Sequence, residues 1–98
     1  MFDKMKGLFE MQKKMQEVKR ALEEAVFEIK SSDGAVEMKM NGAQQVQEVR
    51  IKEGLTPQEN ARLGDSLKDT FNRAVKRSQE IAAGKMREVT GINLPGLT

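Results

Sequence analysis

The hydrophobic periodicity of the chain changes twice, and this restricts the folds open to it. Over residues 2–25 the apolar side chains recur every three or four residues, which places them on one face of a helix. Over residues 26–52 apolar and charged residues alternate, as is typical of strands with one exposed face. From residue 57 to about residue 90 the helical spacing returns. We therefore expect a helix, a group of strands and a second helix, in that order.

The first predicted helix carries its apolar residues in a seven-residue repeat, which puts them on one seam. The seam consists of Leu8, Met11, Met15, Val18, Leu22 and Ala25. No glycine or proline follows Gly7 in this segment. Methionine fills irregular cores well. We therefore interpret this Met-rich seam as a packing surface rather than as a promiscuous binding groove.

Turn-forming residues divide the alternating stretch into three strands. The segment Ser31-Ser32-Asp33-Gly34 predicts the first turn, and Asn41-Gly42 is a strong hairpin signal. The strands between these turns are expected to pair antiparallel, with one apolar and one charged face.

Both ends of the second predicted helix carry recognisable signals. Thr56 is suited to cap it, Pro57 to occupy its first position and Glu59 to complete a capping box. Gly91 is expected to end it, leaving a short C-terminal tail over residues 91–98. The prediction is a single α+β domain, residues 1–98, with α-β-β-β-α order and a three-stranded antiparallel sheet.

The lengths of the two helices indicate self-association. At 1.5 Å per residue they would be roughly 35 and 50 Å long, whereas a compact chain of this size has a diameter of about 26 Å. A three-stranded sheet also leaves its edges open, and its apolar face needs a cover. We therefore expect a homodimer in which the two long helices project as arms.

The charges are segregated along the chain although the net charge is only +2. Residues 1–20 hold six basic and three acidic side chains, and residues 73–98 hold five and two. Residues 21–72 hold six basic and ten acidic side chains. The predicted topology places the two basic segments at the far tips of the helices, which is the charge distribution of a nucleic-acid site.

The composition argues against catalysis and against a metal site. The chain has no His, Cys, Trp or Tyr, so it lacks the usual general base, thiolate nucleophile and zinc ligands. We expect no enzyme activity, no cofactor, no metal and no small-molecule substrate. No apolar run approaches the roughly 20 residues of a membrane span, and charges interrupt the N-terminal segment. A cytoplasmic protein without a membrane partner is the resulting expectation.

Several short motifs, in order, resemble one known family. They are Met1-Phe2, Met11-Gln12-Lys13-Lys14-Met15-Gln16-Glu17, Gly34-Ala35-Val36-Glu37-Met38-Lys39-Met40-Asn41-Gly42, Asn72-Arg73-Ala74 and Val89-Thr90-Gly91-Ile92-Asn93-Leu94-Pro95-Gly96. Together they are similar to the YbaB/EbfC family of bacterial nucleoid-associated proteins. The resemblance implies a tweezer-like homodimer that binds double-stranded DNA through its helical arms and affects nucleoid organisation and gene expression. One departure is that Gly91 stands alone where many members have two glycines.

The candidate DNA-binding residues follow from the charge pattern. They are Lys4, Lys6, Lys13, Lys14, Arg73, Lys76, Arg77, Lys85 and Arg87. Lys85 and Arg87 also suit the dipole at a helix C-terminus, but Lys4 and Lys6 oppose it at a helix N-terminus. Asn72 is a weaker candidate for contact with a base edge.

Two other functions fit the same features. Paired helices leaving a sheet are also typical of a prefoldin-like chaperone module, with Met1, Phe2, Met5, Leu8 and Phe9 as an apolar tip. A basic segment with Met and Phe over residues 1–20 is compatible with an anionic lipid surface.

Overall fold

The predicted α-β-β-β-α class is confirmed. The computed structural model describes residues 2–91, without the side chains of residues 2–4 and 90. Its elements are α1 (Phe2–Glu24), β1 (Val26–Lys30), β2 (Val36–Asn41), β3 (Val46–Ile51), α2 (Pro57–Ala61) and α3 (Leu63–Thr90). The strands form one antiparallel sheet in the order β1-β2-β3.

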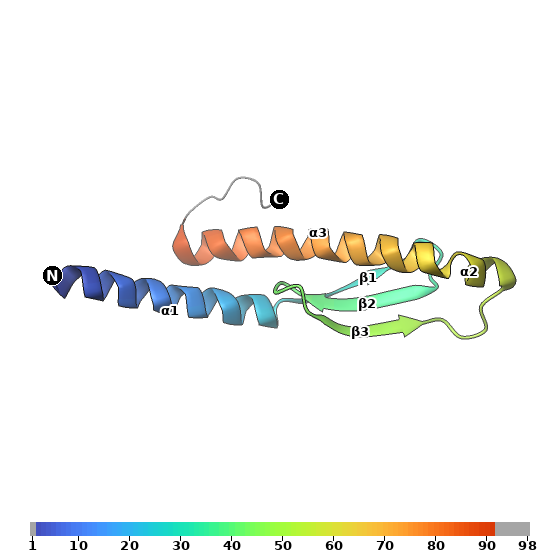
Figure 1. Cartoon of the computed structure of the whole chain (residues 1–98), viewed down its shortest axis with the longest axis horizontal. Helices are drawn as coiled ribbons and strands as arrows, with labels where there is room; N and C mark the ends of the chain where they lie inside the picture. The colour runs from blue at the N-terminus through green and yellow to red at the C-terminus, as the bar shows by residue number, and fades with distance from the viewer. Residues whose placement is uncertain (1, 92–98) are drawn as a thin grey trace.

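The molecule is much longer than it is wide. Its extents are 68 × 23 × 16 Å, and its radius of gyration of 18.2 Å exceeds the value of about 13 Å for a compact chain of this length. Helix α1 leaves one end of the sheet, and α2 lies at the other end (Figure 1). Helix α3 runs back over the sheet and then beside α1, whose N-terminal half extends past it (Figure 1). Only the C-terminal half of α3 therefore lies alongside the other long helix.

The core lies between α3 and the first two strands. Met38 and Met40 of β2 are buried against Ala74 of α3, and Phe27 and Ile29 of β1 pack at the margin. These residues alternate with charged ones along each strand, as the sequence predicts. The register pairs Phe27 with Met40 and Ile29 with Met38, so the four side chains share one face.

The first turn is held together by the carboxylate of Asp33. It accepts hydrogen bonds from the Ser31 hydroxyl at 2.6 Å and from the Ala35 N–H at 3.0 Å. Its other oxygen accepts from the Ser66 hydroxyl at 3.0 Å, which ties the turn to the start of α3. Gly34 adopts a left-handed conformation with φ of 74°, as the turn requires.

The second turn forms a hairpin as predicted, but not the two-residue turn typical of Asn-Gly. The loop contains four residues, 42–45, and its left-handed residue is Gln44 rather than Gly42. Gly42 is needed instead for close packing, because a Cβ there would lie 3.0 Å from Ile81 and 3.1 Å from Leu22. Its N–H donates to the Leu22 carbonyl at 2.9 Å, so the hairpin is fastened to the end of α1.

The predicted second helix is divided at Arg62. Thr56 and Glu59 form the predicted capping box at the start of α2, with both hydrogen bonds 3.1 Å long. At Arg62, φ and ψ are −95° and 0°, and its N–H is shared between the Gln58 and Glu59 carbonyls. This local departure from helical geometry separates α2 from α3. Gly91 ends α3 in a left-handed conformation, as expected.

Replacing Asp33 with Asn is expected to destabilise the fold in a pH-dependent way. The Ser31 hydroxyl, and next the Ala35 N–H, lower the pKa of Asp33 from its ordinary value of 3.8. The folded pKa therefore lies below the unfolded one, and the stabilisation is present above about pH 4 and lost as pH falls further. Urea unfolding should show a lower midpoint for Asp33→Asn at pH 7 and a smaller difference from the unmodified protein at pH 3. An equal difference at both pH values would contradict the role of the ionised carboxylate.

Adding a methyl group at Gly42 is expected to cost stability, whereas adding one at Gly84 is not. In Gly42→Ala the new Cβ would approach Ile81, Leu22 and a Leu22 carbonyl oxygen 3.2 Å away, for a loss of about 1–3 kcal/mol. In Gly84→Ala the nearest atom is the Arg87 Nη2 at 3.9 Å, and helix propensity predicts a gain of up to about 1 kcal/mol. Urea unfolding of the two variants measures both values, and equal stabilities would show that Gly42 is not tightly enclosed.

Candidate nucleic-acid interface

The N-terminal half of α1 is the part of the described chain that extends furthest from the sheet (Figure 1). The seam of α1 is covered only at its C-terminal end, beside α3. Val18 is 3% exposed, whereas Met15 is 46%, Met11 62% and Leu8 68% exposed. The predicted seam therefore packs within the chain over its C-terminal turns and is open over its N-terminal turns.

The basic side chains of α1 face solvent. Lys6, Lys13 and Lys14 are exposed, and none forms an ion pair with a described acidic residue. The Lys13 ammonium lies 5.6 Å from the centre of the Phe9 ring, a cation–π contact that leaves its charge available. The backbone of Lys4 is part of α1, and its side chain lies outside the described residues.

The basic side chains of α3 are partly neutralised by neighbours on the same helix. Arg77 lies 3.5 Å from Glu80, and Lys85 lies 3.4 Å from Glu88. Lys76 and Arg87 have no ion pair within the described part of the chain. Exposed pairs of this kind are worth at most about 1 kcal/mol, so a phosphate group could replace either carboxylate.

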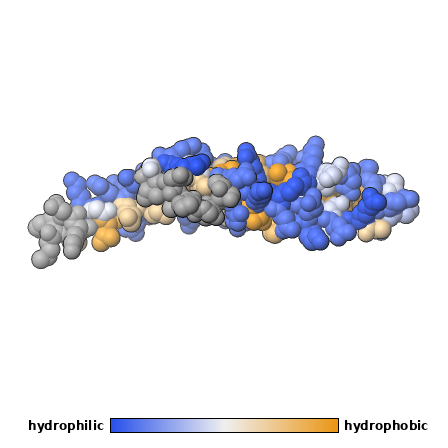
Figure 2. Space-filling view, turned by 90° about the horizontal axis from the view of Figure 1, so that it is seen from above, coloured by the Kyte–Doolittle hydropathy of each residue, from blue (hydrophilic) through white to orange (hydrophobic). Residues whose placement is uncertain are grey.

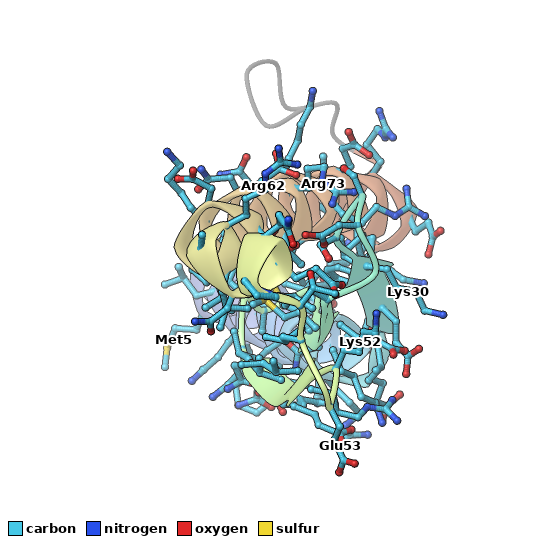
Figure 3. All side chains as sticks on the ribbon, turned by 90° about the vertical axis from the view of Figure 1, so that its right-hand side faces the viewer. Met5, Lys30, Lys52, Glu53, Arg62 and Arg73 are labelled. Carbon is cyan, nitrogen blue, oxygen red and sulfur yellow. The ribbon has the colours of Figure 1, made fainter. Side chains whose placement is uncertain are left out.

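The structure places Arg73 over the sheet rather than on an arm, and Lys76 and Arg77 follow on the same part of α3, between the core residue Val75 and Ser78, which is bonded to β2. Its guanidinium donates to Asp69 at 3.1 Å and to the Lys30 carbonyl at 2.7 Å. Viewed along the long axis, Arg73 and Arg62 lie in the helical layer, and Lys30 lies at the side of the sheet (Figure 3). These contacts explain Arg73 as a link between α3 and β1. Asn72 beside it is also exposed.

Two further basic residues of α1 are as exposed and as free of ion pairs as Lys6, Lys13 and Lys14, but they are not among the sequence-based candidates. Lys19 and Arg20 are exposed and form no ion pair with a described residue. The signal that identifies Arg20 is its spacing, since Lys6, Lys13 and Arg20 are seven residues apart. The predicted residues therefore divide between α1, the part of α3 over the sheet (Arg73, Lys76 and Arg77) and the part of α3 beyond it (Lys85 and Arg87).

Two apolar surfaces remain uncovered in the single chain. The register places Val46, Val49 and Ile51 of β3 on the same sheet face as the core residues of β2. Helix α3 covers β1 and β2 but not β3, so these three side chains are between 43% and 46% exposed. The second surface is the open part of the α1 seam, where hydrophobic side chains show along the helix past α3 (Figure 2).

The described residues offer no arrangement suited to a metal. A shallow depression at the α2 end is lined by hydroxyls, carboxylates and Arg62, but no group of three acidic ligands could hold an ion there or elsewhere in the described chain. No helix in that same part of the chain is both long and apolar enough to cross a membrane.

The chain is similar to known proteins over nearly its whole length. Residues 1–92 match the model of the YbaB/EbfC DNA-binding family. The chain is 35% identical to a nucleoid-associated protein of Alkaliphilus metalliredigens, over 95% of this chain and 83% of that protein. It is also 35% identical to one from Legionella pneumophila, over 93% and 82% of the two chains.

A solved structure shares the fold. The crystal structure of an uncharacterized protein from Helicobacter pylori superposes with a TM-score of 0.69, covering 82% of this chain and 86% of that one at 21% identity. The family match spans nearly the whole chain and agrees with the predicted resemblance. The chain belongs to the YbaB/EbfC DNA-binding family.

Proposed function

We propose that this chain binds duplex DNA as a homodimer, through basic side chains of α1 and of the distal half of α3. The observation that carries the proposal is the exposure of unpaired cations on a helix that extends away from the core. The family name and the names of the relatives support DNA as the partner. The contact residues remain those predicted from the sequence, and Arg73 already has two of its donors engaged, by Asp69 and Lys30.

The proposed mechanism is electrostatic. Lysine and arginine side chains neutralise phosphates and release condensed counterions, which gives affinity with little sequence information. Such binding requires no catalysis, in keeping with a chain that has no His or Cys. The protein would act in the nucleoid, within the cytoplasm, by changing DNA organisation and thereby gene expression.

The uncovered apolar surfaces support the homodimer. Val46, Val49 and Ile51 form an apolar row on β3 beyond the edge of α3. The open α1 seam adds Leu8, Met11 and Met15. Exposed apolar side chains grouped in this way are typical of surfaces that bind another protein. A second copy is a self-complementary cover for both surfaces.

A charge placed in the apolar row of β3 is expected to weaken the dimer. In Val49→Glu a carboxylate would have to be desolvated at the proposed interface. Light scattering coupled to gel filtration should give a dimer for the unmodified protein and a larger monomer fraction for Val49→Glu. The control Gln47→Glu adds the same charge to the same strand outside the apolar row and should remain dimeric. A monomeric unmodified protein would refute the homodimer.

Reversing four charges on the arms is expected to abolish DNA binding while leaving the dimer intact. The variant combines Lys13→Glu, Lys14→Glu, Lys76→Glu and Arg77→Glu. Its control carries the same total charge change at the sheet end, in Lys30→Glu, Lys52→Glu, Arg62→Glu and Lys68→Glu. Fluorescence anisotropy with a labelled duplex should show binding only for the control, with helix content of both checked by circular dichroism. Unchanged affinity in the arm variant would rule out these residues as contacts.

A second candidate function rests on the exposed apolar side chains at the α1 end. Met5, Leu8 and Phe9 are between 63% and 71% exposed, which suits a prefoldin-like module that holds unfolded proteins. Suppression of the aggregation of an unfolded client by a protein without DNA affinity would favour this function.

A further inference from the structure

Helix α1 has two opposite faces of different chemistry. One face carries the apolar seam, which α3 covers at Val18 and Leu22. The other carries Lys6, Lys13 and Arg20, all exposed. Because seven residues are nearly two helical turns, these three cations form one row, about 21 Å long.

The surface around this row is polar and contains no competing ion pair within the described chain. Gln16 lies between the cations and lines shallow depressions together with Lys13 and Arg20. Glu17 lines one of these depressions but pairs with neither cation. The side chain of Phe9 supports the Lys13 ammonium. The cations of the row are therefore free of ion pairs within the described chain, although Glu10, Glu17 and Glu24 run beside them at the same seven-residue spacing.

Two cations of α3, by contrast, form ion pairs. Arg77 and Lys85 are each paired with a glutamate one turn further along the helix. A phosphate that approaches Arg77 or Lys85 must displace a carboxylate, whereas one that approaches the α1 row displaces only water and counterions, as it would at Lys76 and Arg87, which have no ion pair in the described chain. The row also lies on the opposite side of α1 from the seam, so a partner subunit that covers the seam would leave the row free.

We infer that the face of α1 opposite the seam is the principal DNA-contacting surface, with Lys6, Lys13 and Arg20 bound to phosphates. The inference rests on the proposed DNA-binding function and adds to it the contacting face and a further contact residue, Arg20. Successive cations of the row are about 10.5 Å apart along the helix, so each would contact a different phosphate. Lys14 and Lys19 lie about 100° to either side of the row, so they are expected to contribute less.

Two double variants test the inference. Lys13→Gln with Arg20→Gln removes two charges from the row. The flank variant, Lys19→Gln with Lys68→Gln, removes two exposed charges outside it. Removing one cation that neutralises a phosphate should reduce affinity about eightfold at 0.1 M salt, so the row variant should bind on the order of 50-fold more weakly per engaged subunit. The row variant should also lower the slope of log K against log salt by about 1.8. The flank variant should bind less than about threefold more weakly, because its two lysines lie outside the row that engages the phosphates.

The outcomes separate the inference from the function on which it rests. Equal reductions in affinity for the two variants, with DNA binding by the unmodified protein, would overturn the assigned face and leave the function standing. Absence of binding by the unmodified protein would overturn both. Binding to anionic vesicles is the remaining comparison. If the unmodified protein binds vesicles but not duplex DNA, this face of α1 is a lipid-binding surface and the inference is overturned. Thermal unfolding checks that both variants are folded.

Discussion

The contacts of Asn41 and Gly42 with both long helices determine how the chain is arranged. The Asn41 side-chain amide donates to the Glu23 carbonyl at 3.2 Å, and the Gly42 N–H donates to the Leu22 carbonyl at 2.9 Å. Both carbonyls belong to the last turn of α1, where helical bonding is incomplete, and the Leu22 carbonyl accepts in addition from the Ala25 N–H at 3.3 Å. The buried Ser78 hydroxyl of α3 donates to the Asn41 carbonyl at 3.0 Å. The ends of α1 and β2 and the middle of α3 therefore meet at the hairpin between β2 and β3. From this point α1 runs away from the sheet, alongside α3.

This arrangement leaves a chain of 98 residues unable to cover its own apolar surface. Helix α3 is wide enough for two strands, so the apolar row of β3 stays open, and α1 extends past the end of α3. In the proposed dimer a second copy covers both surfaces. The basic row of α1 lies on the opposite face, so the proposed subunit association and the proposed DNA binding would use separate faces of one helix. A short protein can in this way combine both functions without a large core.

Most of the fold is predictable from local patterns, because each element has a clear period and clear ends. The capping box at Thr56 and Glu59 and the helix end at Gly91 are sequence-local features, and both are present. The position of α3 over the sheet is not predictable, since nothing local distinguishes a helix that projects from one that folds back. The sequence pattern consequently assigns Arg73 to an arm, although this residue lies over β1. The hairpin at Asn41 follows from its residue types, but the need for glycine at residue 42 arises from Leu22 and Ile81, which are distant in sequence.

The most direct test of the central claim is the affinity of the unmodified protein for a fluorescent duplex across a salt series, beside a duplex of scrambled sequence. Binding through phosphate contacts predicts an affinity that falls steeply and linearly in log K against log salt, with similar values for the two duplexes. Absence of binding even at low salt would contradict the claim, and the basic residues of the arms would then serve solvation or contact with another protein.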